Sequence, residues 1–361
     1  MSKKAKATGK PKAAAAADEN VVTRQMVLAN YAKACKAIGV QVEPQVNDVL
    51  RGTEEDGEIV NLILEGEPPA PIGPGGVRAL VMAVSVLYGA GPGIVCGAYT
   101  HLRYIRIWKQ GIGDEGVVAL APLLQSRPPG INVAYLELLD CGVGEDGCRA
   151  LGAALRGQRD PGLLTLNLKY NAAVGDAGVA ALCDGLFTNS VLKHLHLDYC
   201  GIGAAGAVKL AQLVSIPACA VETLSLQGNT LRDEGLRDLS QGLARSQRLV
   251  TLNLADNAIR HNAEALVAFR DALLRSKALA HVDMTYNHIE VDGATILLPA
   301  LAPVSTAAQF VTVCDAENAK LRSFQVDASL PPELFEQLNR APPAEGKKKG
   351  KKKGGASKKK K

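Results

Sequence analysis

Three short glycine motifs have a spacing that could cradle a phosphate group. Each is Gly-x-Gly-x-x-Gly, and the three begin at Gly111, Gly142 and Gly201. In dinucleotide-binding proteins such a loop follows a strand and opens a helix, so that backbone N–H groups face the pyrophosphate. Here the residue between the first two glycines is apolar each time, and the first two loops contain acidic residues that would repel a phosphate. The motifs therefore indicate repeating turns, and we expect no cofactor.

Histidines and cysteines lack the spacing that metal binding or nucleophilic catalysis requires. His194 and His196 flank Leu195 on one expected strand, but no third ligand follows at a spacing typical of zinc. No Ser-His-Asp or paired-carboxylate arrangement stands out from the surface residues. The eight cysteines include no Cys-x-x-Cys pair, so reduced, buried thiols are favoured over metal or disulfide sites. We therefore expect a protein that is not an enzyme and has no metal centre.

Lysine runs mark both ends of the chain. The first twelve residues contain five lysines and the last fifteen contain ten, with no acidic residue in either segment. Because the whole chain has a net charge of +5, residues 13–346 carry a net charge of −10. Neither run includes an aromatic side chain for base stacking. We expect the C-terminal run to bind polyanions, either acidic protein tails or nucleic acid, through Lys347, Lys348, Lys349, Lys351, Lys352, Lys353, Lys358, Lys359, Lys360 and Lys361.

The sequence between the lysine runs repeats with a period of 28–31 residues. The pattern L-x-x-L-x-L-x-x-(N/C)-x-(L/I/V) begins at residues 102, 133, 163, 192, 221, 249 and 279, with a looser copy at Ile59 and a degenerate one at Ala308. Alternating Leu-x-Leu predicts a short strand with its leucines facing inward. The Asn or Cys that follows can hydrogen-bond backbone groups in the turn, and a glycine then opens an amphipathic helix. Such units stack into a solenoid with atypical end repeats.

These motifs resemble those of the ribonuclease-inhibitor-like subfamily of leucine-rich-repeat proteins, and the resemblance covers residues 59–313. It implies an α/β solenoid of horseshoe shape, with a parallel sheet on the concave face and helices on the convex face. It also implies a binding scaffold, because that family shares no catalytic residue. The repeat motif is specific for the fold and does not identify the partner.

Segments on both sides of the repeats are expected to cap the solenoid. A helix from Asn20 to Gly39 would bury Val22, Met26, Ala29, Tyr31 and Cys35, and another helix would begin at Pro331-Pro332. The spacing Tyr31-x3-Cys35-x3-Gly39, followed by Pro44 and Val49-Leu50, is similar to the first segment of leucine-rich-repeat proteins of cilia and flagella. The predicted organisation is a basic tail (1–19), an N-terminal helical cap (20–58), the repeat array (59–306), a C-terminal cap (307–341) and a Lys-rich tail (342–361).

Outward-facing strand positions contain the candidate binding residues. The single tryptophan and most of the outward tyrosines lie in the first half of the array. Aromatic residues, Arg and Asp dominate binding hot spots, although packing of these rings against one another is the alternative explanation. We expect a protein partner on the concave face, in contact with Tyr104, Arg106, Trp108, Lys109, Tyr135, Glu137, Lys169, Tyr170, Asp198 and Tyr199.

Together these features favour a non-enzymatic scaffold in a large intracellular assembly, with the axoneme of a cilium or flagellum as the leading hypothesis. The lysine runs would then contact the acidic tails of tubulin, and the protein would reside in the cytoplasm, with the nucleus as an alternative. A second hypothesis is a regulator that acts in trans on a GTPase, although leucine-rich-repeat activators of that kind have an acidic C-terminal tail. A third is an RNA- or ribosome-associated factor. The apolar stretch 79–99 is interrupted by glycine and proline, so no membrane span is expected.

Overall fold

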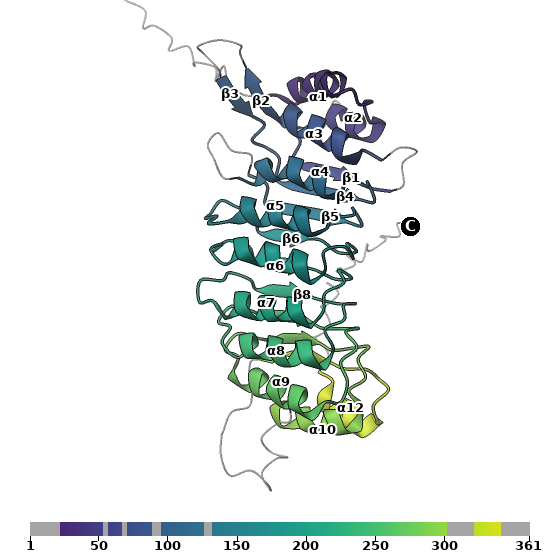
Figure 1. Ribbon diagram of the computed structural model, residues 1–361, viewed down its shortest axis with the longest axis vertical. Helices are drawn as coiled ribbons and strands as arrows, with labels where there is room; N and C mark the ends of the chain where they lie inside the picture. The colour runs from purple at the N-terminus through teal and green to yellow at the C-terminus, as the bar shows by residue number, and fades with distance from the viewer. Residues whose placement is uncertain are drawn as a thin grey trace, which may run out of the picture. The chain divides into compact units, whose positions relative to one another are not determined.

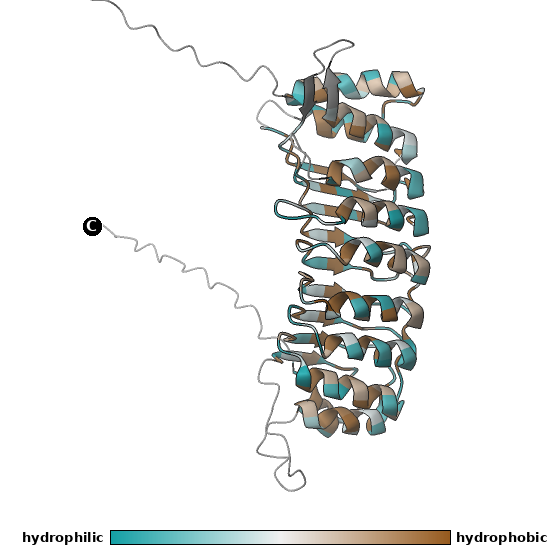
Figure 2. Cartoon of the chain, turned by 60° about the vertical axis from the view of Figure 1, so that its left-hand side comes forward, coloured by the Kyte–Doolittle hydropathy of each residue, from teal (hydrophilic) through white to brown (hydrophobic). Residues whose placement is uncertain are grey.

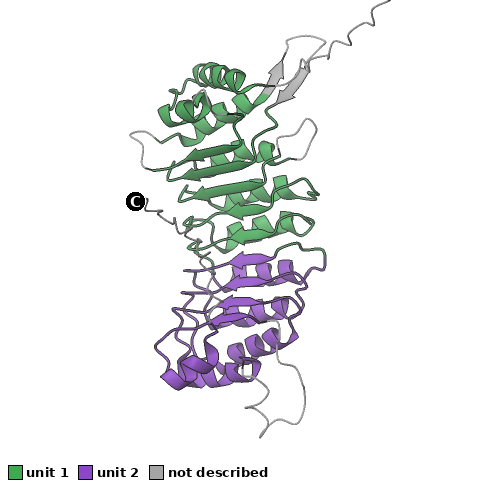
Figure 3. Ribbon diagram, turned by 180° about the vertical axis from the view of Figure 1, so that it is seen from behind, with its two compact units in different colours: residues 1–202, 218–221 green, residues 203–217, 222–361 purple. Residues whose placement is uncertain are grey.

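A repeating strand–turn–helix unit builds the described part of the protein (Figure 1). The computed structural model describes residues 22–52, 57–66, 71–88, 95–125, 132–301 and 321–340. The chain divides into two compact units, which are described separately (Figure 3). Unit 1 comprises residues 1–202 and 218–221, and unit 2 comprises residues 203–217 and 222–361.

The described strands of unit 1 form a parallel sheet in the order β1-β4-β5-β6-β7. The register advances by one repeat at each step, so that Tyr104 lies opposite Tyr135, Tyr135 opposite Thr165, and Thr165 opposite His194. Equivalent positions of successive repeats are therefore neighbours in space. The strands are β1 (Asn61–Leu64), β4 (Tyr104–Trp108), β5 (Tyr135–Leu139), β6 (Thr165–Asn167) and β7 (His194–His196).

Helices cover one side of the unit 1 sheet and leave the other side open (Figure 2). Their apolar residues recur at helical spacing, and in the helix of residues 175–186 these side chains are buried against the sheet. The helices are α1 (Arg24–Ile38), α2 (Pro44–Arg51), α3 (Gly73–Val84), α4 (Gly113–Leu120) with a 3-10 turn (Ala121–Leu124), α5 (Glu145–Leu155) and α6 (Gly175–Leu186).

Unit 2 repeats the same arrangement, with its described strands parallel in the order β8-β9-β10-β11. These observations confirm the predicted α/β leucine-rich-repeat solenoid, with a parallel sheet on one side and helices on the other. The strands are β8 (Thr223–Ser225), β9 (Thr251–Asn253), β10 (His281–Asp283) and β11 (Ser323–Gln325). The helices are α7 (Ala204–Ser215), α8 (Arg232–Leu243), α9 (Ala263–Arg275), α10 (Glu290–Leu301) and α12 (Pro332–Leu338).

Close contact between neighbouring helices depends on glycine at one position. A Cβ atom added to Gly185 in α6 would lie 1.9 Å from the backbone oxygen of Gly152 in α5. No side chain can occupy that space, because backbone atoms cannot move aside as a flexible side chain can. The two glycines therefore allow α5 and α6 to pack closely.

The predicted N-terminal helix is present, but the residues that it buries differ from those expected. Helix α1 begins after Thr23, whose Oγ1 accepts a hydrogen bond from the Met26 N–H, and it ends at Gly39 in the left-handed conformation. Ala29, which was expected to be buried, is exposed, and Met26 is half-buried. The inner face of the helix is completed by Val27 and Ala34, and the expected set of buried residues was therefore rotated around the helix. The buried residues of α1 are Val27, Tyr31, Ala34 and Cys35.

The last described strand of unit 2 lies in a segment for which no repeat was predicted. The degenerate repeat expected at Ala308 lies outside the described residues. Strand β11 pairs with β10 instead, and it belongs to a Leu321-x-x-Phe324-x-Val326 pattern whose three apolar residues are buried. That spacing matches the repeat motif, and the phenylalanine at a leucine position concealed it. Helix α12 begins at Pro332, as predicted.

A two-stranded antiparallel sheet within unit 1 was not predicted. Strand β2 (Ser85–Tyr88) continues directly from α3 and pairs with β3 (Val95–Ala98). Both strands fall in the apolar stretch 79–99, in which no membrane span was expected. Across the described ranges, no helix is both long enough and apolar enough to cross a bilayer.

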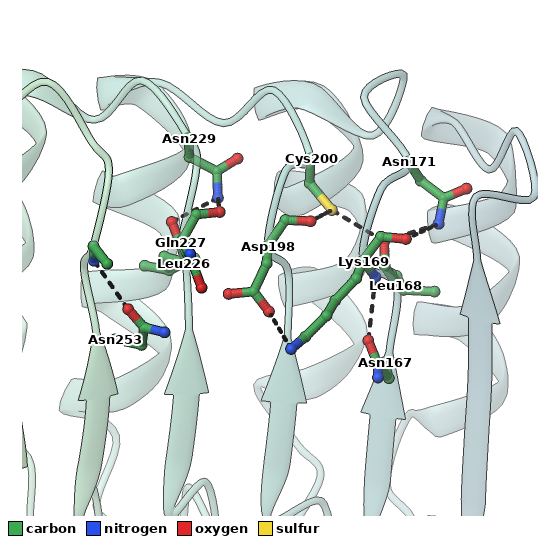
Figure 4. A network of polar contacts seen from close by, with 11 residues as sticks. Asn167, Leu168, Lys169, Asn171, Asp198, Cys200, Leu226, Gln227, Asn229 and Asn253 are labelled. Atoms are coloured by element: carbon green, nitrogen blue, oxygen red, sulfur yellow. Dashed lines mark hydrogen bonds and ion pairs between the residues drawn. The ribbon is translucent and has the colours of Figure 1, made fainter. Parts of the chain in front are cut away.

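Buried asparagine side chains hold the turns that follow the strands (Figure 4). The Asn171 Nδ2 donates hydrogen bonds to the carbonyl oxygens of Leu138 and Leu168, at 2.7 and 2.8 Å. Its Oδ1 accepts hydrogen bonds from the backbone N–H groups of Cys141 and Val143, both at 3.0 Å. Asn171 thus links its own turn to the turn of the preceding repeat and satisfies polar groups that are removed from water.

Cysteine occupies the same position in two other repeats. The Cys141 Sγ lies 3.2 Å from the Ile107 carbonyl oxygen and 3.3 Å from that of Leu139. Burial raises the pKa of Cys141 to about 11 and that of Cys200 to about 12, so both remain thiols that can donate a weak hydrogen bond. The described cysteines are buried thiols outside any disulfide, namely Cys35, Cys141, Cys148, Cys183, Cys200 and Cys219.

We expect replacement of Asn171 by Ala to lower the free energy of unfolding by about 3 kcal/mol or more, because several buried backbone groups would lose their partners at about 1–3 kcal/mol each. Urea unfolding followed by far-ultraviolet circular dichroism measures this loss. Cys141→Ala is the matched control at the equivalent position, with an expected loss of about 1 kcal/mol, because a thiol is only a weak donor. Equal losses for the two variants would show that the amide network does not stabilise the turn.

Candidate protein-binding face

Alternate side chains of the unit 1 strands project from the side of the sheet opposite the helices, which we call the strand face. In β4, Ile105 and Ile107 are buried in the core, whereas Tyr104, Arg106 and Trp108 are half-buried on the strand face. This alternation agrees with the register expected from Leu-x-Leu. The strand face therefore collects one set of polar and aromatic side chains from each repeat.

Aromatic residues lie together at the beginning of the strand face. The Tyr104 and Tyr135 rings are 6.1 Å apart between centroids and tilted by 54°, a favourable aromatic geometry. The Lys109 Nζ lies 5.9 Å from the centroid of the Trp108 ring, within cation–π range. Burial, and secondarily the nearby Glu137 carboxylate, raise the pKa of Tyr104, so its phenol stays neutral. These contacts pair Tyr104 with Tyr135 and Trp108 with Lys109, and all four residues belong to β4, β5 or the turn after β4.

An arginine flanked by two carboxylates lies beside the aromatic residues. The Arg106 Nε is 2.9 Å from Glu65 Oε1 and 3.6 Å from Glu137 Oε2. The three side chains come from successive repeats, so the parallel register places the cation between the two anions. Glu65 was not among the predicted site residues. It could have been found by applying the repeat register to the looser first copy, because it immediately follows β1.

A lysine and a buried aspartate form the next part of the strand face (Figure 4). The Lys169 Nζ lies 3.0 Å from Asp198 Oδ2. Asp198 was expected to contact a partner directly, but it is only 1% exposed. Its short side chain stays close to the sheet, so it positions Lys169 and reaches little of the surface. Burial, together with the Lys169 charge, lowers the pKa of the neighbouring His196, whose imidazole therefore remains neutral near pH 7.

Left-handed residues form a second feature, the turn ridge, just after the strands β4, β5, β6 and β7. It consists of Lys109, Asp140, Tyr170 and Tyr199, which have φ angles of 55°, 50°, 64° and 56°. The Tyr170 and Tyr199 rings stack at 5.1 Å with an interplanar angle of 9°, and Tyr170 is 54% exposed. A left-handed backbone costs a bulky residue about 1–2 kcal/mol. Tyr170 and Tyr199, in successive repeats, both adopt this conformation, and their ring stack offsets part of its cost.

The chemistry available on the strand face and the turn ridge is recognition. These surfaces offer stacked rings, ion pairs and hydrogen-bonding groups from several repeats, and their mutual contacts fix many side-chain rotamers before any partner arrives. Among the described residues, no group of three His, Cys, Asp or Glu side chains is arranged to hold a metal ion. The structure thus places nine of the ten predicted contact residues on the strand face or the turn ridge, whereas Asp198 is buried.

A family model described as leucine-rich repeat matches residues 162–183, 188–211 and 219–240. These are leucine-rich repeats. The ribonuclease inhibitor of Mus musculus is 33% identical over 192 residues, which cover 53% of this chain and 40% of the inhibitor. NACHT, LRR and PYD domains-containing protein 14 of Mus musculus is 27% identical over 225 residues, covering 62% of this chain and 22% of that protein. The predicted resemblance to ribonuclease-inhibitor-like repeats is confirmed.

The chain therefore matches less than half of the length of these relatives. Among solved structures, a leiomodin-1 structure with actin-binding site 2 has 15% sequence identity and a TM-score of 0.35, covering 42% of this chain and 86% of that one. A similarity this low does not indicate a shared function.

We expect Tyr170→Gly to leave the free energy of unfolding within about 1 kcal/mol of wild type. The variant removes a left-handed penalty of about 1–2 kcal/mol and loses a ring stack worth about 0.5–1.5 kcal/mol. Urea unfolding tests this, with Leu168→Ala as the control, because removing that buried leucine should cost about 2–5 kcal/mol. A loss above about 3 kcal/mol for Tyr170→Gly would mean that the tyrosine is needed for folding.

Proposed function

We propose that the protein is a non-enzymatic scaffold that binds another protein through the strand face and turn ridge of unit 1. The observation that carries this proposal is the cluster of Tyr104, Arg106, Trp108 and Tyr135 on adjacent strands. Large aromatic and Arg side chains dominate binding energy when a partner removes them from water. Their ion pairs and ring contacts reduce the entropy that is lost on binding.

We further propose that the assembly is the axoneme of a cilium or flagellum. The support is the resemblance carried by the N-terminal segment, whose residues build the cap in the structure. Tyr31 and Cys35 are buried, Gly39 ends α1 and Pro44 begins α2. The residues that carry the resemblance thus belong to two helices that precede β1.

Affinity capture of the full chain from ciliated cells, followed by mass spectrometry, tests the axonemal proposal. Axonemal proteins should be enriched over a control chain in which Trp108 is replaced by Ala. Enrichment of a small GTPase instead would favour a regulator that acts in trans, and enrichment of ribonucleoprotein components would favour an RNA-associated factor. Either of those results would replace the axonemal assignment.

Trp108→Ala should weaken the affinity for a co-purified partner by about 2 kcal/mol or more, as truncation of a hot-spot residue does. Isothermal titration calorimetry with the purified partner measures the change, after circular dichroism has shown that the variant is folded. Thr251→Ala, in β9 of unit 2, is the matched control and should change the affinity far less. Unchanged affinity for the Trp108 variant would remove the strand face of unit 1 as the binding surface.

The ten lysines of residues 347–361 lie outside the described residues, and we propose that they add contact with an acidic surface such as the tails of tubulin. Binding of the full chain to polyglutamate should then fall steeply between about 50 and 200 mM salt, because screening and counterion release govern such contacts. Deletion of residues 347–361 should weaken this binding and leave Tm unchanged. A fall in Tm of many degrees would show that the segment belongs to the folded core.

A further inference from the structure

An aspartate followed one repeat later by a tyrosine occurs twice at the left-handed turn position. In unit 1 the pair is Asp140 and Tyr170, with φ angles of 50° and 64°. In unit 2 it is Asp256 and Tyr286, with φ angles of 54° and 59°. We call each pair an Asp–Tyr step. The same two residue types in the same order at the same repeat position indicate one recognition element that is used twice.

Backbone hydrogen bonds place the two members of each Asp–Tyr step side by side. The Asp140 N–H donates to the carbonyl oxygen of Lys169, the residue before Tyr170, at 3.1 Å. The Asp256 N–H donates in the same way to the carbonyl oxygen of Thr285, the residue before Tyr286, at 2.9 Å. The carboxylate and the ring thus start from adjacent points of neighbouring turns, in the same arrangement in both units.

One face of the Tyr170 ring is accessible on the side of Asp140. Tyr199, from the following repeat, stacks on one face of Tyr170, whereas Asp140 belongs to the preceding repeat. The aspartate therefore lies toward the face of Tyr170 that Tyr199 does not cover. Tyr170 is 54% exposed and Tyr286 is 69% exposed, so water reaches both rings.

The carboxylates of the Asp–Tyr steps are not used within the protein. Asp140 and Asp256 are exposed, and neither side chain forms an ion pair or a hydrogen bond with another described residue. Lys169, the cation closest in sequence to Tyr170, is paired with Asp198. Each step therefore presents one exposed carboxylate, with no hydrogen bond or ion pair to its side chain among the described residues, beside one exposed tyrosine.

The left-handed conformation of the tyrosine is costly for a bulky side chain. Asp tolerates the left-handed region because its short side chain fits there, whereas a bulky Tyr does not. Gly228 occupies this position in another repeat, at a φ angle of 69°, and shows which residue would satisfy the backbone alone. Strained residues of this kind concentrate where a ligand is held.

We propose that each Asp–Tyr step binds an arginine side chain of a protein partner. A planar guanidinium group can lie over the open tyrosine face as a cation–π contact and donate two hydrogen bonds to the adjacent carboxylate. A lysine ammonium group supplies the charge without the planar stack. This inference rests on the proposed protein-binding role of the turn ridge of unit 1, and it specifies that the partner presents arginine to that ridge and to the equivalent turns of unit 2.

The test uses the full chain with ¹³C-labelled tyrosine rings and the probe tripeptide acetyl-Gly-Arg-Gly-amide. We expect saturable chemical-shift changes at Tyr170, Tyr199 and Tyr286, assigned with Tyr→Phe variants that keep each ring face. The matched lysine tripeptide should bind roughly two- to five-fold more weakly, which corresponds to the cation–π contact at an exposed site. The citrulline tripeptide has a similar planar shape without charge and should give no saturable change.

Single substitutions separate the two steps, and each serves as the control for the other. Asp140→Asn should weaken arginine binding at Tyr170 about five-fold and leave the shift at Tyr286 intact, because an exposed ion pair contributes up to about 1 kcal/mol. Asp256→Asn should do the reverse. Both positions are exposed, and unchanged Tm values would show that the variants fold normally.

Other results would overturn the inference. If the citrulline tripeptide bound as tightly as the arginine tripeptide, the carboxylate would not contribute to binding. The same would follow if the chemical-shift changes were unaffected in both Asp→Asn variants. If the lysine tripeptide bound as tightly as the arginine tripeptide, the lysines of residues 347–361 would be the more suitable occupant. Deletion of residues 347–361 would then free the site and strengthen binding of the peptide. Trp108→Ala should leave the peptide shifts unchanged, so that loss of the arginine site and loss of the strand-face interface give different results.

Discussion

The constraint on which the whole structure depends is the buried turn after each strand. Backbone groups there are cut off from water, and an asparagine such as Asn171 supplies the hydrogen bonds that replace it. Because the side chain reaches the preceding turn as well as its own, it also sets the register of neighbouring repeats. The residue just before the asparagine must then adopt a left-handed conformation, as Tyr170 does. Strand alignment, helix direction and the turn ridge all follow from this turn.

Parallel register then decides which charges meet on the open side of the sheet. Arg106 lies between Glu65 and Glu137 because all three occupy neighbouring positions of successive repeats. The Lys169–Asp198 pair has the same origin. Such ion pairs add little stability where they are exposed, but they hold long side chains in defined rotamers. The strand face is therefore ordered before it meets a partner.

The fold was predictable because leucines mark its period, and few other residue types can replace a buried leucine. Details that depend on a single repeat could not be predicted. Asp198 was expected at the surface, and only the side-chain positions show that it is buried under Lys169. The Tyr170–Tyr199 stack needs the left-handed turn geometry, which residue type does not reveal for tyrosine. The strand β11 was concealed by Phe324 at a leucine position, and the hairpin of β2 and β3 interrupts the period altogether.

Most residues must satisfy both the backbone conformation of their position and the packing of their side chain. At the left-handed turn position these two requirements are independent. Its backbone is fixed by the asparagine next to it, while its side chain points away from the core, so packing does not dictate its identity. Lys109, Asp140, Tyr170 and Tyr199 show how widely that identity varies within one unit. Binding specificity can therefore diverge one repeat at a time while the fold persists. The limit on such divergence is conformational: a residue other than Gly, Asn or Asp persists there only where its contacts outweigh a penalty of about 1–2 kcal/mol.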